Sequence, residues 1–236
     1  MKFQESLRWT DMTRDRTVER SYSGYSRFDK RGALEQKAFR INRSPGKRSL
    51  DIAVALFSLS FLLPAFLAIA LAIKLSSRGP VFFRQERYGA GGKTFKIYKF
   101  RTMRVLEANG SFKQASRNDP RVTAVGAWLR RSSMDELPQL INVLAGSMSL
   151  VGPRPHAVAM DDYYNAIIPD FSLRHLVRPG LTGFAQVSGY RGPTDDLQAI
   201  RGRLSRDVAY IHNWSLMTDI VILTRTPSAL FGQNAF

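Results

Sequence analysis

The sequence predicts an α/β monotopic membrane protein, and three observations support this fold class. A run of 22 residues without a charged side chain, Ile52 to Ile73, is long enough to enter a bilayer. Two strand-like segments separated by glycines follow it, and segments with helical periodicity come after them. We therefore expect an N-terminal re-entrant membrane helix, a short β-hairpin and several surrounding helices, some of them amphipathic and interfacial.

Residues 1–46 precede the apolar run and are polar and rich in arginine, with no sustained hydrophobic period. Such a segment buries too little apolar surface to offset the entropy lost on folding. We expect a basic, flexible tail over residues 1–46. It either associates electrostatically with a membrane or is solvated without a specific role.

The membrane segment is predicted over residues 47–78, too far from Met1 for a secretory signal. Pro64 lies near its middle, where the missing N–H and the ring predict a kink or a break. Basic residues flank the run on both sides, and basic flanks prefer the cytoplasmic side. A helix-break-helix that dips in and returns satisfies both flanks, and a proline-kinked spanning helix is the alternative.

Residues 79–232 are predicted to form one domain on the same side of the membrane. Strands at 80–84 and 94–103, with glycines between them, indicate a hairpin. A helical pattern begins at Thr123, and one apolar face carries Leu137, Leu140, Ile141 and Leu144. Further helices are expected at 156–167, 195–212 and 215–230, and the last is short enough to be an interfacial or docking helix.

Composition narrows the possible functions. The chain has no cysteine, which excludes disulfides and thiolate sites, and its three histidines lack metal-ligand spacing, which argues against a zinc enzyme. The 35 Lys+Arg against 19 Asp+Glu give a net charge of +16, so polyanionic partners are expected. Because of the apolar run, we expect anionic lipid headgroups and phosphorylated substrates, and no nucleic acid.

Asp135 and Glu136 are adjacent carboxylates that follow Arg130 and Arg131. A structural explanation exists, because Ser133 and Glu136 have the spacing of a capping box. That explanation leaves Asp135 and the arginine pair without a purpose, since neighbouring carboxylates repel and need cations to offset them. A structural and a catalytic role both stay open for this segment.

Two arginine motifs favour phosphate binding. Arg154 lies between Pro153 and Pro155, which fix the backbone and hold the guanidinium at a set position for bidentate contact. Arg178 begins the segment RPGLTG, whose glycines allow close backbone approach. With Lys99 and Arg101 they form a set suited to phosphate, although a rigid turn with an exposed arginine is an alternative for each motif.

Several motifs in order carry a resemblance to one family. They are KRSLDI (47–52), the apolar run with Pro64, TFKIYKFRTM (94–103), DPRVTAVG (119–126), the segment from Leu129 to Pro155 and RPGLTGFAQVSG (178–189). Together they resemble bacterial sugar transferases of the small monotopic phosphoglycosyl transferase type, close to exopolysaccharide priming enzymes. One departure is Leu63, because the family commonly has serine before the membrane proline.

The resemblance implies an activity. Members of the family move a sugar-1-phosphate from a UDP-sugar to undecaprenyl phosphate or another polyprenyl phosphate, release UMP and start a glycan such as an exopolysaccharide. It also implies that Asp135 is the nucleophile, forming a phosphosugar-aspartyl intermediate, and that Glu136 helps to hold Mg²⁺. The candidate substrate- and phosphate-binding residues are Lys99, Arg101, Arg130, Arg154, Arg178 and Gln186.

The resemblance also implies a location at the inner (cytoplasmic) membrane, with residues 79–232 as a catalytic domain on the cytoplasmic face. A non-catalytic, membrane-anchored interaction protein of polysaccharide assembly is the rival interpretation, and the intact Asp135–Glu136 pair and Arg154 count against it. The sequence leaves open whether the sugar is glucose, galactose or an N-acetylated sugar, and whether the protein forms a homo-oligomer.

Overall fold

The computed structural model describes residues 27–104, 119–190 and 196–230. Its helices are α3 (Arg27–Arg43), α4 (Pro45–Ser76), α5 (Ala124–Ser132), α6 (Gln139–Ala145), α7 (Val158–Ile167), α8 (Phe184–Val187), α9 (Leu197–His212) and α10 (Leu216–Leu230), with 3-10 turns η1 (Ala90–Gly92), η2 (Met134–Glu136) and η3 (Phe171–Leu176). The strands are β1 (Phe82–Tyr88), β2 (Thr94–Phe100), β3 (Ser149–Val151) and β4 (Gly180–Thr182).

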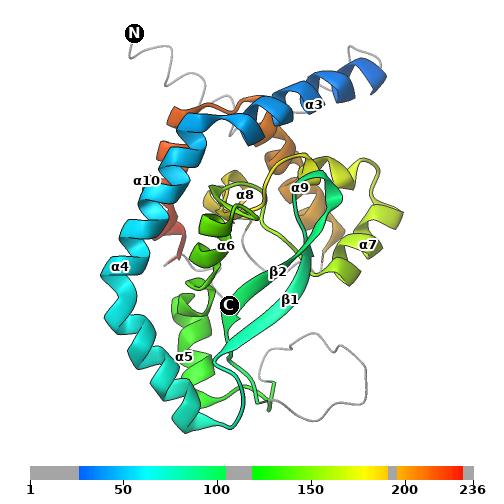
Figure 1. The fold of residues 1–236 in the computed structure, drawn as a ribbon. Coiled ribbons are helices and arrows are strands. Elements are labelled where there is room, and N and C mark those ends of the chain that lie inside the picture. The colour runs from blue at the N-terminus through cyan, green and yellow to red at the C-terminus, as the bar shows by residue number, and fades with distance from the viewer. Residues whose placement is uncertain (1–26, 105–118, 191–195, 231–236) are drawn as a thin grey trace.

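The arrangement is helix-rich, with one long apolar helix beside a mixed body. Helix α4 runs along one side of the molecule, and α3 crosses its N-terminal end (Figure 1). Helices α5 and α6 lie between α4 and the hairpin β1–β2 (Figure 1). The predicted helices at 156–167, 195–212 and 215–230 are confirmed as α7, α9 and α10.

Helix α3 corrects the expectation of a flexible tail over residues 1–46, of which 1–26 lie outside the described residues. Leu34, Ala38 and Ile41 recur at helical spacing, are almost fully buried and join the main core beside Tyr210 and Ile211. This apolar stripe is narrow and lies among charged residues. The overall composition of the segment is therefore polar, although one face of the helix is apolar. Asn42 also donates to the Leu176 carbonyl oxygen at 2.8 Å, which ties α3 to the body.

Helix α4 continues through Pro64, so of the kink or break expected there the break is not formed. Proline removes one N–H from the ladder and crowds the preceding turn, and a bend can absorb both effects without ending the helix. Figure 1 shows α4 curved rather than straight. The helix begins with Ser44, whose hydroxyl oxygen accepts from the Lys47 N–H at 3.3 Å, and with Pro45 in its first turn.

Both ends of α4 are fixed to the same body. Near its start, the buried Lys47 donates to Asp219 of α10 at 2.7 Å and to the Val151 carbonyl oxygen at 2.9 Å. One turn later, Asp51 accepts from the Leu150 N–H at 2.9 Å. Near its end, Ile69 and Ile73 are buried in a second apolar cluster with Phe100 and Leu129.

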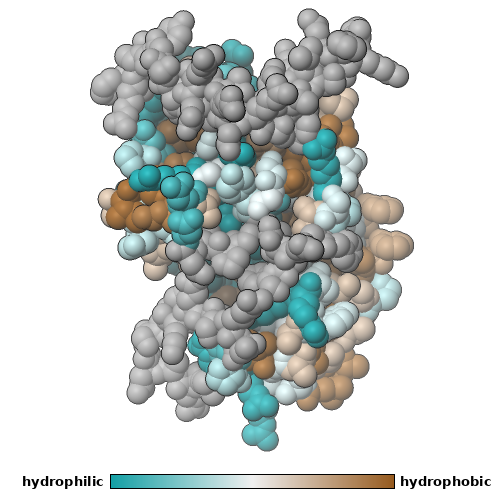
Figure 2. All heavy atoms as spheres, turned by 180° about the vertical axis from the view of Figure 1, so that it is seen from behind, coloured by the Kyte–Doolittle hydropathy of each residue, from teal (hydrophilic) through white to brown (hydrophobic). Residues whose placement is uncertain are grey.

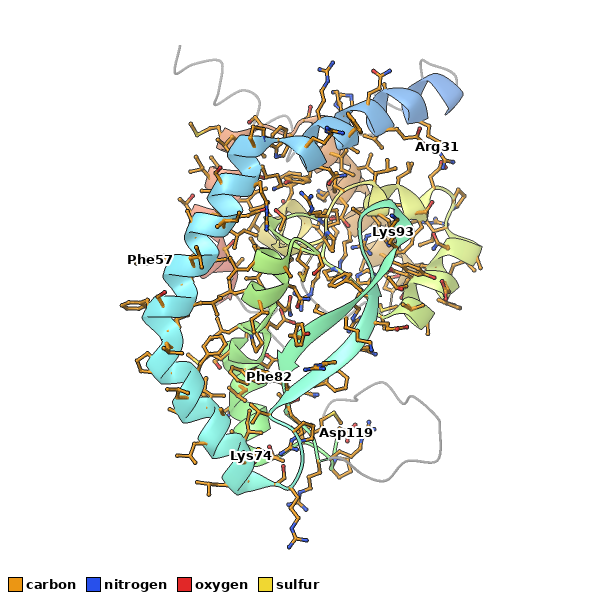
Figure 3. All side chains as sticks on the ribbon, viewed as in Figure 1. Arg31, Phe57, Lys74, Phe82, Lys93 and Asp119 are labelled. Atoms are coloured by element: carbon orange, nitrogen blue, oxygen red, sulfur yellow. The ribbon has the colours of Figure 1, made fainter. Side chains whose placement is uncertain are left out.

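The middle and outer face of α4 present apolar side chains to the surroundings. Only 17% of its most apolar 18-residue window is buried, and by length and composition it is the one described helix able to cross a membrane. In Figure 3, Phe57 lies on the outer side of α4, and Figure 2 shows apolar surface along the side of the molecule where α4 runs. The large exposed apolar residues of this helix are Leu56, Phe57, Phe61, Leu63, Leu67, Leu71 and Leu75.

The predicted hairpin is confirmed, with strands that differ from the predicted ones at their ends. Strands β1 and β2 pair antiparallel, from Phe82 with Phe100 to Tyr88 with Thr94. The connection turns at Gly91 and Gly92, which have φ of 69° and 73°, a region that favours glycine. The hairpin orders the segment that contains Lys99.

Strands β3 and β4 form a short parallel pair that the sequence did not predict. Ser149 pairs with Gly180 and Val151 with Thr182, so GPRP after β3 and GF after β4 emerge at the same edge. The two backbones approach closely at Gly152, where an added Cβ would lie 2.4 Å from the Arg178 carbonyl oxygen. Glycine at this position therefore permits the pairing that fixes the start of the Arg154 segment.

We expect Gly152→Ala to lower the free energy of unfolding by about 1 to 3 kcal/mol, because the new methyl group meets backbone atoms that cannot rotate away. Gly32→Ala on α3 is the matched control, since nothing lies within 4 Å of its added Cβ. Thermal unfolding of the purified protein in detergent compares the two. An unchanged midpoint for Gly152→Ala would contradict the close approach.

Candidate active site

The acidic pair lies on a tight turn between α5 and α6. Helix α5 ends at Ser133, which adopts a left-handed conformation with φ of 56°, and the 3-10 turn Met134–Glu136 follows. The Ser133 side chain makes no cap hydrogen bond to this turn, so the expected capping box is not formed. The turn instead directs Asp135 and Glu136 toward β2 and the segment after β3, where the cations lie.

Glu136 is the centre of an ion-pair cluster. Its Oε1 accepts from Lys99 Nζ at 2.7 Å and from Arg154 Nη2 at 2.5 Å, and its Oε2 accepts from Arg154 Nη1 at 2.8 Å. The Glu136 side chain is 12% exposed. Burial alone would raise its pKa, but Arg154 and Lys99 outweigh burial and hold the pKa of Glu136 well below its usual range.

Asp135 differs from Glu136 because its carboxylate has no direct partner among the described residues. Within the described part of the chain, no hydrogen bond or ion pair engages its carboxylate, although the charges of Lys99, Arg154 and Arg130 act on it. Burial and the neighbouring charge of Glu136 raise the pKa of Asp135 to about 6. It is therefore a partly desolvated carboxylate that is ionised near pH 7 and surrounded by cations.

The structure brings three of the predicted phosphate-binding residues together. Lys99 lies on β2, Arg154 follows β3, and Arg130 lies in the last turn of α5, where its Nε donates to Thr102 Oγ1 at 2.9 Å. All three act electrostatically on Asp135. Such a set can neutralise a phosphate group next to an attacking carboxylate.

Arg101 does not belong to this cluster. It is buried, and its guanidinium donates to the carbonyl oxygens of Arg78 at 2.9 Å and Ser77 at 2.7 Å, beyond the end of α4. The guanidinium is thus committed to free carbonyl groups where the helix ends. Arg101 therefore fastens the segment after α4, and its predicted role in phosphate binding stays a prediction.

The contacts of Arg178 and Gln186 also involve neither Asp135 nor Glu136. Arg178 donates to the Asn42 carbonyl oxygen at 2.9 Å and fastens α3 to the body, and its phosphate contact stays a prediction. Gln186 in α8 is buried, and its Nε2 lies 3.4 Å from the Leu181 carbonyl oxygen. Its Oε1 is buried without a hydrogen-bond partner among the described residues.

A buried network of charged side chains holds the backbone of Arg154, and the sequence did not predict it. Arg174, 2% exposed, donates to the Arg154 carbonyl oxygen at 2.6 Å and forms an ion pair with Asp207 at 3.0 Å. Asp161 lies 3.0 Å from both His156 Nδ1 and His175 Nε2. The clue available in the sequence was that three of these five ionisable residues, His156, Asp161 and Asp207, lie in segments expected to be helical. The network fixes the backbone that presents Arg154.

The acidic pair is the candidate site for a divalent cation. No group of three or more His, Asp or Glu that could hold a metal occurs in the described residues. Magnesium, however, is commonly bound by one or two carboxylates together with substrate phosphates. Glu136 Oε2 accepts one hydrogen bond here against two at Oε1, and Asp135 accepts none from described residues, so the pair fits that mode.

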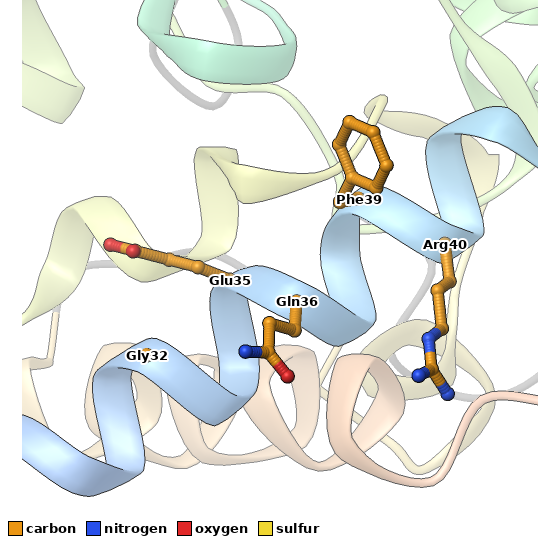
Figure 4. A pocket seen from close by; sticks show the side chains of 5 residues that line it. All are labelled: Gly32, Glu35, Gln36, Phe39 and Arg40. Atoms are coloured by element: carbon orange, nitrogen blue, oxygen red, sulfur yellow. The ribbon is translucent and has the colours of Figure 1, made fainter.

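A hollow elsewhere on the surface has a different character. It is lined by Gly32, Glu35, Gln36, Phe39 and Arg40, all on α3, and includes no residue of the acidic cluster. Figure 4 shows that its side chains point in different directions. The cluster around Asp135 is therefore the better candidate for an active site.

Comparison with known proteins agrees with this geometry. A family model described as bacterial sugar transferase matches residues 42–233. The UDP-glucose:undecaprenyl-phosphate glucose-1-phosphate transferase of Escherichia coli (strain K12) is 53% identical over 189 residues, which are 80% of this chain and 41% of that protein. A protein of the same name from Caulobacter vibrioides is 53% identical over 191 residues, 80% of this chain and 72% of the relative.

A third relative has a different sugar in its name. The UDP-N-acetylgalactosamine-undecaprenyl-phosphate N-acetylgalactosaminephosphotransferase of Aeromonas hydrophila is 44% identical over 181 residues, 76% of this chain and 42% of that protein. The chain thus spans about two fifths of the length of the Escherichia coli and Aeromonas relatives. The family match includes the acidic pair, Lys99, Arg130 and Arg154, and the chain belongs to the bacterial sugar transferase family.

Proposed function

We propose that the protein transfers a sugar-1-phosphate from a UDP-sugar to undecaprenyl phosphate, releases UMP and so initiates an exopolysaccharide or related glycan. The observation that carries this proposal is the Asp135 carboxylate, which is partly desolvated, uncommitted among the described residues and surrounded by Lys99, Arg130 and Arg154. The relatives named above act, by their names, on UDP-sugars and undecaprenyl phosphate.

In the first step, an Asp135 oxygen attacks the phosphorus that carries the sugar. A bond forms between that oxygen and phosphorus, and the bond from phosphorus to the bridging oxygen breaks. UMP leaves with the electron pair, and a phosphosugar-aspartyl intermediate remains. The nearby cations oppose the repulsion between two anions and stabilise the charge that develops on the phosphoryl oxygens.

In the second step, an oxygen of the lipid phosphate attacks the same phosphorus. The bond from Asp135 to phosphorus breaks, the carboxylate recovers its electron pair, and the lipid-linked diphosphosugar is released. Glu136 does not attack in this scheme. Its ion pairs hold Lys99 and Arg154 in place, and its Oε2, which accepts only one of the three hydrogen bonds, is the oxygen better placed for a metal ion. Two half-reactions through one intermediate predict ping-pong kinetics.

Magnesium would be held by Glu136 together with oxygens of the diphosphate, and Asp135 is the other carboxylate within the pair. When bound, the cation would neutralise phosphate charge and favour departure of UMP. Lys99, Arg130 and Arg154 supply the protein's own share of that neutralisation. We propose UDP-glucose as the first donor to test, because two of the three relatives described have glucose in their names.

We propose that α4 is re-entrant and that both of its ends face the cytoplasm at the inner membrane. The supporting observation is that α3, before this helix, packs into the same core as α9, after it. A helix that crossed the bilayer would place α3 and the body on opposite sides. The exposed apolar side chains of α4 would then lie among lipid tails, with flanking basic residues at the headgroups.

Asp135→Asn should abolish lipid-dependent UMP release, because an amide cannot form the acyl phosphate. The assay uses the detergent-solubilised full chain with a panel of UDP-sugars, with and without undecaprenyl phosphate. Glu35→Gln on the exposed face of α3 is the control and should turn over like the wild type. Turnover by Asp135→Asn at the wild-type rate would refute the nucleophile.

Chelation of divalent cations should stop the same reaction, and added Mg²⁺ should restore it. The reason is that the cation set around the diphosphate loses its metal while Lys99 and Arg154 remain partly committed to Glu136. Full activity in excess EDTA would remove the metal from the mechanism.

The rate should fall on acidification with a midpoint near pH 6, because the pKa of Asp135 is raised to about 6 and only the ionised carboxylate attacks. A group with this pKa is ionised above pH 6 and protonated below it, so kcat/KM at pH 5 should be about tenfold below that at pH 7. A flat profile between pH 5 and pH 7 would contradict this assignment.

Single cysteines can test the topology cleanly, because the chain has none of its own. Ala33→Cys before α4 and Lys93→Cys after it are both exposed positions, and we expect an impermeant maleimide to label both from the cytoplasmic side only. Labelling from opposite sides would establish a spanning helix.

A further inference from the structure

Arg87 lies on the face of the hairpin that carries Lys99. Residues directly paired across β1 and β2 share a face, and Phe83 pairs with Lys99. Side chains alternate along a strand, so Phe83, Gln85 and Arg87 point to that same face. The end of β1 also forms a backbone bridge with Ala157, three residues after Arg154. The topology therefore brings Arg87 beside the Arg154 segment.

The Arg87 guanidinium has few partners for a charged group that is largely buried. Its Nη2 donates to Gln85 Oε1 at 2.7 Å, and its Nε is buried without a hydrogen-bond partner. Among the described residues, no carboxylate forms an ion pair with it. Arg154 and Arg174, in contrast, are both paired with carboxylates. A buried and unpaired cation is costly unless an anion binds to it.

The charges around Arg87 place it at the edge of the acidic cluster. Burial and the charge of Arg154 lower the pKa of Arg87 to about 10, while Asp161 and Glu136 act in the opposite direction. The guanidinium thus stays protonated at pH 7. The charge of Glu136 acts on both Arg87 and Arg154, and two guanidinium groups near one carboxylate leave an excess of positive charge, which suits a phosphate.

The same interactions distinguish two positions for phosphate. Lys99, Arg154 and Arg130 act on Asp135, whereas Arg87 lies on β1 four residues beyond the partner of Lys99 and bridges to Ala157. Arg154 acts on both Asp135 and Arg87. The phosphate attacked by Asp135 therefore belongs with Lys99, Arg130 and Arg154, and a second phosphate of the same substrate would extend past Arg154 toward Arg87.

We propose that Arg87 binds the nucleotide-side phosphate of the UDP-sugar, the phosphate that leaves as part of UMP. This inference rests on the proposed function, because it requires a diphosphate substrate at the acidic pair. Arg87 then acts on the departing group, whereas the cations near Asp135 act on the phosphate that stays with the sugar.

The test is direct binding of UMP to the full-length protein, measured by titration calorimetry in detergent. Arg87→Gln should weaken UMP binding about 10- to 100-fold, because a charge-assisted contact is lost. Arg87→Lys should lose less, since it keeps the charge without the planar fork. Arg84→Gln is the matched control, because Arg84 lies on the opposite face of the same strand, against the ring of Tyr98.

Uridine, which lacks the phosphate, is the second ligand, and all variants should bind it with equal affinity. Unchanged uridine binding also shows that the site of a variant is folded. Equal UMP affinity for Arg87→Gln and the wild type would overturn the role of Arg87 and leave the proposed function intact. If Arg87→Gln does not fold, unchanged UMP affinity in folded Arg87→Lys overturns it instead. A wild-type protein that binds neither UMP nor any UDP-sugar would refute the proposed function, and this inference with it.

Discussion

The carboxylate of Glu136 is largely buried, and keeping it charged there requires cations in direct contact. Lys99 and Arg154 meet that requirement from β2 and from the segment after β3. One ion-pair cluster thereby joins the hairpin, the turn after α5 and the parallel pair β3–β4. The same cluster determines the surroundings of the adjacent carboxylate, Asp135. Because Glu136 occupies the near cations, the adjacent Asp135 is left without a partner among the described residues, which is the condition that the proposed attack requires.

The cluster in turn depends on the elements that present its members. Arg154 follows a strand whose pairing requires Gly152, and its carbonyl oxygen is held by the buried Arg174. Lys99 depends on the hairpin, which packs against α6 through Asn142, whose side chain bonds to the backbone of Tyr98 and Lys96. Few of these supports touch the proposed substrate, yet each sets the position of a charge. The geometry of the site therefore depends on the packing of the whole folded body, not on the acidic turn alone.

Sequence reasoning succeeded where a residue's role follows from local pattern and failed where it depends on distant partners. The apolar run, the hairpin and the long C-terminal helices have clear periodicity, and Lys99, Arg130 and Arg154 do surround Asp135. The carbonyl contacts of Arg101 and Arg178 could not be predicted, because nothing local in the sequence shows which backbone oxygens an arginine will meet. The strands β3 and β4 have three residues each, too few for a recognisable alternation. Helix α3 was missed because its apolar stripe is only one residue wide.

The two attachments of α4 have a mechanical consequence. Lys47 and Asp51 hold one end of the helix, and Ile69, Ile73 and the carbonyl contacts of Arg101 hold the other. A rod fixed at two separated points can neither slide along its axis nor roll about it. On the proposed topology, the depth of this rod in the lipid and the height of Asp135 above the headgroups are then a single variable. A change in how deeply α4 enters the lipid would therefore move Asp135 by the same amount.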